Sequence, residues 1–305
     1  MSTELIPAAL EGERVDRVVS MLFGLPRREV AALVASGGVR LAGRAVAQRS
    51  ARVREGEALD VDVPPSAGAP ARPRPDPGVG VIVIHSDDDV VVVDKPSGLV
   101  VHPGAGRPAG TLVNGLLHLF PEMATVGDPA RPGIVHRLDV GTSGLLVVAR
   151  TEAAFDSLVA QLAGRSVERT YLALAWSDFD TTSCAVDAPV GRSPANRTQM
   201  GVVADGRPAR TSFSVLERFR SPAPCTLLSC KLDTGRTHQV RVHLAAIGHP
   251  VVGDARYGGA RPMLPSRRPF LHAHRLAFDH PATGRRVSFD SPLPLELVTV
   301  HDLLG

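Results

Sequence analysis

The fold is decided by the segment His136–Ala149, whose sequence is HRLDVGTSGLLVVA. Its second part, Leu145–Ala149, is a short apolar run that predicts a buried strand. The first part is polar and contains two glycines, so it predicts a loop leading into that strand. Loops at the ends of rigid strands commonly carry functional residues, which makes Asp139 a candidate for chemistry. Taken alone, an Asp close to a Gly is more often a turn residue, so the rest of the chain must decide between the two interpretations.

The chain around this segment predicts a mixture of strands and helices. Many neighbouring strand candidates are separated by connections too short for a helical crossover, which favours antiparallel pairing. We therefore predict an α+β domain over residues 79–305, with a largely antiparallel central sheet flanked by helices and loops. Its other predicted strands are Val79–His85, Val90–Val93, Tyr171–Ala175, Arg210–Glu217, Thr226–Leu232 and Val287–Asp290, and its predicted helices are Thr111–Leu119, Glu152–Ala163 and Thr237–Ile247.

A proline-rich segment precedes this domain. Residues 64–78 contain six prolines and two glycines among fifteen residues. Proline removes backbone donors and favours an extended, semi-rigid chain, so the segment predicts a linker. Residues 1–63 are then a separate small α/β domain, in which two short helices precede short strands. The helices are predicted at Val15–Leu22 and Arg27–Ser36, and the strands at Val39–Leu41, Ala45–Ala47 and Leu59–Val63.

The charges of this small domain are segregated. It contains nine arginines and nine acidic residues in total, but residues 27–54 hold seven arginines and a single acid, Glu29. A solvated helix and hairpin would explain this pattern, and so would a surface that binds a nucleic-acid backbone. On the second interpretation, the candidate phosphate-binding residues are Arg27, Arg28, Arg40 and Arg44.

Composition narrows the class of protein. Hydrophobic residues make up 44% of the 305 residues, which allows a substantial core. The apolar runs are shorter than the ~18 residues that a membrane span needs, and the N-terminus lacks the pattern of a secretory signal. The three cysteines have no CxxC spacing. We therefore expect a cytoplasmic protein that does not bind membranes.

Several chemical motifs are missing. The chain has no phosphate-binding GxxxxGK[ST] loop, no dinucleotide-binding glycine pattern, no GxSxG nucleophile elbow and no HExxH zinc motif. A chemistry that needs neither cofactor nor metal therefore fits best. Only Lys95 and Lys231 among the 34 basic residues are lysines. A GC-rich genome explains this bias, although guanidinium groups also suit phosphate binding and base stacking.

Four segments stand out together: DKPSGLVVHPG (94–104), HRLDVGTSGLLVVA (136–149), RTYLAL (169–174) and TGRTHQVRVHL (234–244), the last continuing to Gly248-His249-Pro250 and Gly253-Asp254. In order and content they resemble the motifs of the RluA-type pseudouridine synthases. The N-terminal region contains RVDR (14–17), LPRR (25–28) and GVRLAG (38–43). Through these motifs, residues 13–63 resemble the domain named after ribosomal protein S-four. The family branch that carries this domain at its N-terminus acts on large-subunit ribosomal RNA.

The resemblance implies isomerisation of uridine to pseudouridine in RNA. This reaction breaks the bond between the anomeric carbon and the uracil nitrogen, rotates the base and reattaches it through carbon. It is balanced without a reductant or an energy source, so no cofactor is implied. The enzyme must take the uridine out of its stack, at a cost of a few kcal/mol. A carboxylate can attack the base or the sugar, or remove a sugar proton.

The resemblance also assigns catalytic roles. Asp139 is the implied nucleophile, and Tyr171 the aromatic residue that stacks on the base or helps to move a proton. A carboxylate covered by RNA needs a cation to stay ionised, because burial favours its neutral form. By resemblance this partner is Arg241, and we expect a bidentate pair. Local pattern agrees, because a helix capped by Thr237 would place Arg241 near its start, at the edge of the buried face.

Further residues are expected around the uridine. Arg137 is implied to occupy the gap left by the flipped base, and Leu271 to shape the pocket. Lys95 is expected either to support the site or to bind phosphate, and Arg236 to contact phosphate. The expected partner is RNA, in particular ribosomal RNA or a pre-ribosomal particle, and the resemblance implies a monomer.

Two other hypotheses stay open. A non-catalytic RNA-binding or ribosome-assembly protein would use the same fold as a scaffold, but it would not need a buried carboxylate among phosphates. An Asp-dependent hydrolase such as a nucleoside glycosidase would also break a glycosidic bond, but it would release free base.

Overall fold

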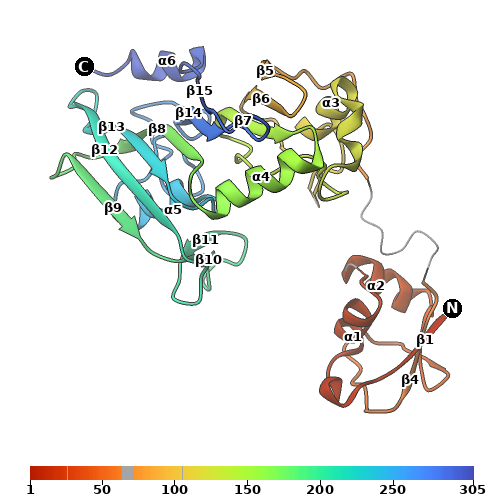
Figure 1. Ribbon diagram of the computed structural model, residues 1–305. Helices are drawn as coiled ribbons and strands as arrows, with labels where there is room; N and C mark the ends of the chain where they lie inside the picture. The colour runs from red at the N-terminus through yellow and green to blue at the C-terminus, as the bar shows by residue number, and fades with distance from the viewer. Residues whose placement is uncertain (26, 64–71, 105) are drawn as a thin grey trace. The chain divides into compact units, whose positions relative to one another are not determined.

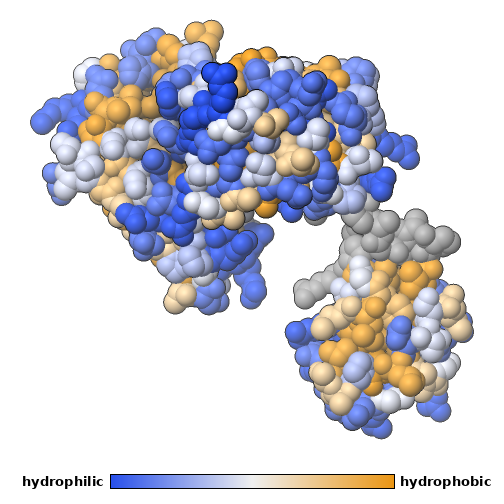
Figure 2. All heavy atoms as spheres, viewed as in Figure 1, coloured by the Kyte–Doolittle hydropathy of each residue, from blue (hydrophilic) through white to orange (hydrophobic). Residues whose placement is uncertain are grey.

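The computed structural model describes residues 1–25, 27–63, 72–104 and 106–305, without the side chains of Arg27 and Arg28. The chain divides into two compact units, residues 1–71 and 72–305, which are described separately (Figure 1). On the face seen in Figure 2, hydrophilic residues cover most of the larger unit. None of the helices among the described residues is long and apolar enough to cross a membrane.

The smaller unit is a four-stranded antiparallel sheet with two helices. Its sheet has the order β1-β4-β2-β3. Valine and leucine side chains from both helices and from β2 and β4 form its core, which includes Val15, Val30 and Leu59. The strand β1 was not predicted, because its side chains are all exposed and give no pattern of burial. The elements are β1 (Ser2–Leu5), η1 (Ala8–Leu10), α1 (Val15–Leu22), α2 (Arg27–Ala35), β2 (Val39–Leu41), β3 (Arg44–Ala45) and β4 (Ala58–Val61).

The larger unit is built on a nine-stranded sheet. Its order is β5-β6-β7-β14-β8-β13-β12-β9, with β15 paired to β14. Every pair is antiparallel except β7 with β14, which confirms the predicted α+β class. The strands are β5 (Val83–Ser86), β6 (Val90–Lys95), β7 (Ser143–Ala149), β8 (Glu168–Trp176), β9 (Ser183–Asp187), β12 (Arg210–Phe219), β13 (Cys225–Leu232), β14 (Leu271–Asp279) and β15 (Arg286–Asp290). A separate hairpin pairs β10 (Val190–Arg192) with β11 (Met200–Val202).

The strand predicted from the opening segment, β7, is buried on both faces. Its alternate side chains enter two different clusters. Leu146 packs in a cluster that contains α3 (Leu112–Leu119), and Leu145 in a cluster that contains α4 (Glu152–Ala163). Figure 1 shows α4 running across one face of the sheet. Each fully buried leucine contributes roughly 1.5–3 kcal/mol, so β7 is a rigid base for the loop that precedes it.

The junction between that loop and β7 needs a glycine. Gly144 has a φ of 112°, and a Cβ there would lie 2.3 Å from the carbonyl oxygen of Ala273 on β14. Only glycine permits this approach of two backbones. Ser143 Oγ is also 2.9 Å from Nδ1 of His272. The end of the loop is therefore fixed to the neighbouring strand.

Several predicted boundaries were wrong. Residues 64–71 of the predicted linker lie outside the described part of the chain, while residues 72–78 belong to the larger unit. Asn114 on α3 donates a hydrogen bond to the carbonyl of Arg74, and the amide of Asp76 donates to the carbonyl of Asn114. The predicted strand Val79–His85 starts only at Val83.

The remaining helices are η2 (Pro121–Thr125), α5 (Gln239–Ala246) and α6 (Leu295–His301).

Candidate active site

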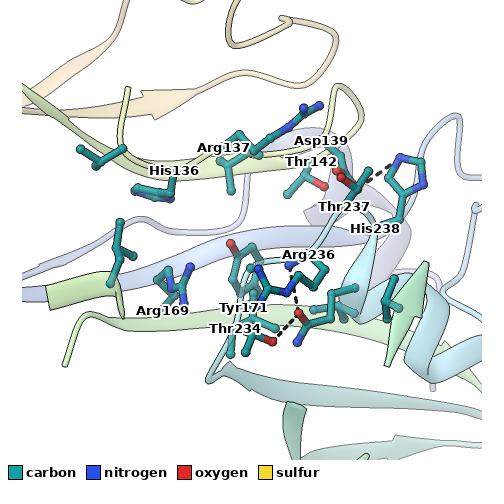
Figure 3. Close-up of a pocket in the computed structure, with 18 of the residues that line it drawn as sticks. His136, Arg137, Asp139, Thr142, Arg169, Tyr171, Thr234, Arg236, Thr237 and His238 are labelled. Carbon is teal, nitrogen blue, oxygen red and sulfur yellow. Dashed lines mark hydrogen bonds and ion pairs between the residues drawn. The ribbon is translucent and has the colours of Figure 1, made fainter. Parts of the chain in front are cut away.

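A cavity of about 690 Å³ lies where the four sequence motifs meet, the first of them through His102. The loop before β7, the first half of β8 and the segment between β13 and α5 form its walls, and β10, β11 and β14 each contribute one residue (Figure 3). The predicted residues Asp139, Tyr171, Arg137, Arg236 and Leu271 all line it. The structure thus brings together side chains that are up to 134 positions apart in the sequence, Arg137 to Leu271.

Asp139 is held by Arg241. The Nη1 group of Arg241 donates a hydrogen bond of 3.0 Å to Oδ2 of Asp139, whose side chain is 13% exposed. Among the described residues, none donates to the other carboxylate oxygen, Oδ1. The carboxylate therefore has a fixed orientation and one oxygen that is open to the cavity.

The prediction of a bidentate pair between Asp139 and Arg241 was wrong, because the other two guanidinium nitrogens of Arg241 bind Asp254. Its Nε and Nη2 lie 2.6 and 2.9 Å from the two oxygens of Asp254, whose side chain is 1% exposed. Burial alone would lower the pKa of Arg241, but the hydrogen bonds and charge of Asp254, together with Asp139, raise it above the ordinary value. Arg241 is thus a permanent cation that joins both carboxylates.

Asp254 is the main site residue that sequence reasoning left without a role. It sits in the Gly253-Asp254 pair of the fourth motif. Its Oδ1 also accepts from the backbone amides of Arg256 and Tyr257. Four hydrogen bonds to one buried carboxylate, two from Arg241 and two from backbone amides, mark Asp254 as the anchor of Arg241.

The helix that carries Arg241 begins later than predicted. His238, rather than Thr237, is its N-cap residue, and His238 has a left-handed backbone with a φ of 59°. The turn is fixed instead by the side chain of Gln239, whose Oε1 accepts from Thr234 Oγ1 and from the amide of Arg236. A Thr cap was unnecessary because the Gln239 side chain already binds the preceding loop.

His238 is a second polar neighbour of Asp139. Its Nε2 lies 3.8 Å from Oδ2 of Asp139, and its Nδ1 lies 2.8 Å from the hydroxyl of Tyr257. That hydroxyl oxygen accepts from the amide of Met200 on β11, so its own proton is available for His238. Burial lowers the pKa of His238, while Asp139 opposes the shift.

Tyr171 lies on β8 with its side chain almost fully buried. Its hydroxyl points towards the segment that carries Arg137 and Asp139 (Figure 3). Burial raises the pKa of Tyr171 to about 12, Arg169 opposes this shift and Asp139 adds to it. The phenol is therefore neutral at physiological pH, where it can donate a proton or a hydrogen bond and present an aromatic face.

Lys95 does not line the cavity. It is 0% exposed, and its ammonium group donates to the carbonyls of Pro96 and Leu99. In the structure the ammonium group is thus bound by main-chain carbonyls and is not open to a phosphate. Within the loop that it closes, the amide of Gly98 donates to the carbonyl of Val140, next to Asp139. Burial lowers the pKa of Lys95 to about 8 and Arg268 adds to the shift, while Asp139 and Asp94 oppose it.

Four arginines of the smaller unit were predicted to bind RNA. The structure describes the side chains of two of them, and both lie on the surface of the unit. Arg40 on β2 and Arg44 on β3 are exposed. The side chains of Arg27 and Arg28 lie outside the described part of the structure, although their backbone forms the start of α2.

One group of described residues has the spacing of metal ligands. Asp87, Asp89 and His280 bring three ligand atoms within 4.8 Å of one another. The carboxylate of Asp87 already accepts from the amides of Asp89 and Val90 and pairs with His85 and His280. None of these residues lines the cavity, and their hydrogen bonds stabilise the turn between β5 and β6.

His136 makes the stability of the larger unit depend on pH. Burial lowers the pKa of His136 to about 3, and Arg169 adds repulsion. Its Nε2 accepts from the amide of Val147 on β7, so the neutral ring is the form that fits. In the unfolded chain the ring takes up a proton below about pH 6.5. The unfolded state therefore binds more protons between the two values, and stability falls as the pH falls through this window.

We expect His136→Gln to reduce this acid sensitivity. Glutamine keeps an acceptor for Val147 but does not titrate, so it removes a contribution of up to about 1.4 kcal/mol per pH unit. Between pH 6.5 and 5, urea unfolding should show the wild type losing about 1–2 kcal/mol more than the variant. Parallel losses in both proteins would show that His136 is not buried as a neutral group.

A carboxylate in a cavity lined by arginines is suited to react with part of a nucleic acid. The sequence supports a nucleic-acid enzyme, because the chain matches the model of the family described as RNA pseudouridylate synthase over residues 89–246. The chain belongs to that family and is an RNA pseudouridine synthase. This confirms the predicted enzyme class and disfavours the scaffold hypothesis.

Individual relatives extend the match over almost the whole chain. An uncharacterized RNA pseudouridine synthase of Chloroflexus aurantiacus is 43% identical, over 97% of this chain and 91% of its own length. A protein of Xanthomonas campestris named ribosomal large subunit pseudouridine synthase D is 42% identical, over 96% of this chain and 89% of its own. Among solved structures, human RNA pseudouridylate synthase domain containing 1 has a TM-score of 0.58 and 29% identity, and covers 75% of this chain and 91% of its own.

Proposed function

We propose that this enzyme converts uridines of large-subunit ribosomal RNA to pseudouridine, with Asp139 as its nucleophile. The observation that carries the proposal is the carboxylate of Asp139, which is held by Arg241 at 3.0 Å and keeps one oxygen open to a cavity lined by arginines. Asp233 is the other described acid in the cavity wall, and its carboxylate lies 3.5 Å from Arg210.

The carboxylate of Asp139 can act in each of the alternative first steps of the reaction. Its open oxygen can attack the anomeric carbon or the uracil ring, or remove a sugar proton. Arg241 fixes its orientation and keeps a positive charge beside it when RNA excludes water. The neutral phenol of Tyr171 supplies an aromatic face and a proton. Leu271 shapes the wall of the pocket, and Lys95 supports the loop beside Asp139.

The other roles concern RNA. Arg137 is exposed at the cavity and fills the gap left by the flipped base, and Arg236 contacts phosphate. The smaller unit is an S-four-type domain that binds RNA through Arg27, Arg28, Arg40 and Arg44. The enzyme acts as a monomer in the cytoplasm, on free ribosomal RNA or on a pre-ribosomal particle. The names of relatives such as the Xanthomonas protein support the ribosomal substrate.

The ribosomal substrate is tested by mapping pseudouridine in the cell. Deleting the gene should remove one or a few pseudouridines from large-subunit ribosomal RNA and leave small-subunit and transfer RNA unchanged. Wild-type protein, but not the Asp139→Asn variant, should restore them. Loss confined to transfer RNA would contradict the proposed substrate but not the enzyme class.

A further inference from the structure

Besides Arg131 and Arg137, four arginines line the cavity with Asp139 and lack a matching set of acids. They are Arg165, Arg169, Arg207 and Arg236, and they come from four different parts of the chain: the turn after α4, β8, the segment before β12 and the loop before α5. Among the described residues, the acids in the cavity wall are Asp139 and Asp233. Asp139 is held by Arg241, and Asp233 lies 3.5 Å from Arg210; the charge of Asp233 also attracts Arg169, but the two do not form an ion pair.

Arg169 is the most unusual member of this cluster. It is 7% exposed, and its Nε has no hydrogen-bond partner among the described residues. No described carboxylate forms an ion pair with it either. A buried cation without a partner costs several kcal/mol, so a protein retains one only where something else will pair with it.

The neighbouring loop is shaped around this guanidinium. A Cβ on Gly235 would lie 2.8 Å from Nη1 of Arg169, closer than real side chains approach. The loop cannot move away easily, because Gln239 binds Thr234 and the amide of Arg236 on either side of the glycine. Gly235 thus leaves the space in which the Arg169 guanidinium lies. Figure 3 shows Arg169 across the cavity from the segment that carries His136 and Arg137.

Arg236 extends the same positive region. Its Nε donates to the carbonyl of Pro208, which leaves its two terminal nitrogens without a partner among the described residues. Burial lowers the pKa of Arg236, and Arg207, Arg165 and Arg169 lower it further in that order, so all three lie near it. Like charges brought together in this way repel one another until an anion binds between them.

We propose that Arg165, Arg169, Arg207 and Arg236 form a binding site for a phosphate of the RNA backbone, with Arg169 as its buried floor. A phosphate suits this cluster better than a uracil carbonyl, because it supplies a full negative charge and several acceptors for guanidinium groups. Bound there, it fixes the strand next to the nucleotide that faces Asp139. This inference rests on the proposed function only in taking RNA as the substrate.

The test compares the full-length wild type with Arg169→Met. Arg285→Met is the matched control, because Arg285 is exposed and does not line the cavity. The probe is a transcript of large-subunit ribosomal RNA, used both in filter binding and in pseudouridine formation at several salt concentrations. Loss of one charge-assisted contact should raise the Kd and KM of Arg169→Met about ten- to hundredfold. It should lower the slope of log affinity against log salt by about 0.7–0.9, with kcat within about threefold of the wild type.

Each outcome decides the proposal. An unchanged Kd and salt slope in Arg169→Met would overturn it, and so would a large fall in kcat at saturating RNA with KM unchanged, since Arg169 would then act on the base. Thermal unfolding should show Arg169→Met at least as stable as the wild type, because an unpaired buried cation is removed. Gly235→Ala should displace the guanidinium and reproduce the weaker binding; normal binding in that variant would count against the site. If the wild type bound RNA but formed no pseudouridine, the proposed function would fail while the binding data still tested the phosphate site.

Discussion

Replacing Asp139 with Asn should lower kcat for pseudouridine formation by roughly 10³–10⁴-fold or more, while the affinity for RNA stays within about threefold. Asparagine has nearly the same shape but a neutral and much weaker nucleophile. The variant should fold normally, because Arg241 keeps both of its hydrogen bonds to Asp254. The measurement is release of tritium from RNA labelled at C5 of uridine, together with filter binding.

Asp156→Asn is the control for this prediction. Asp156 is exposed on α4 and does not line the cavity, so its variant should match the wild type. Activity of Asp139→Asn above a hundredth of the wild-type value would remove Asp139 from the role of nucleophile.

Arg241→Met should lower both stability and activity. The substitution leaves the carboxylate of Asp254, which is 1% exposed, without its cation. Breaking a buried ion pair from one side costs about 3–5 kcal/mol, so urea unfolding should show a loss of this size. The activity should fall as well, because Asp139 loses the donor that orients it.

A double variant separates these two effects. Arg241→Met combined with Asp254→Asn no longer buries an unpaired charge at position 254, so it should recover much of the lost stability. It should remain inactive, because the bond to Asp139 is still missing. Recovery of activity in the double variant, or normal stability in Arg241→Met, would contradict the arrangement of Arg241 between two carboxylates.

The sequence predicted the parts of the site that are local in the chain. The polar loop before an apolar run identified Asp139 and β7, and the helical pattern after Thr237 placed Arg241 near the start of a buried helix. Long-range contacts could not be predicted in the same way. Asp254 takes the bidentate pair because a turn 13 residues after Arg241 folds back on it. Nothing in the residue order indicates that contact, and the start of α5 likewise depends on where the Gln239 side chain binds.

Prediction of the strands was limited in the same way, to elements whose sequence pattern is local. The alternating and apolar strands β6, β7, β8 and β13 were predicted, because their patterns reflect burial. The strand β14 was not predicted, since His272, His274 and Arg275 interrupt its apolar pattern. All three residues have partners elsewhere in the chain: His272 contacts Ser143, His274 contacts the carbonyl of Ser291, and Arg275 pairs with Asp290. Arg169 belongs to one of the four motifs, but only the three-dimensional structure shows that its Nε lacks a hydrogen-bond partner among the described residues.

Isomerisation of uridine by this enzyme is tested most directly by analysing the products that the purified protein forms. Ribosomal RNA incubated with the wild type should be digested to nucleosides, separated by chromatography and identified by mass spectrometry. We expect pseudouridine to appear in place of uridine, with no added cofactor, no change in nucleoside mass and no free uracil. Release of uracil with abasic sites in the strand, or unchanged uridine under conditions in which the RNA is bound, would contradict isomerisation in the cavity of Asp139.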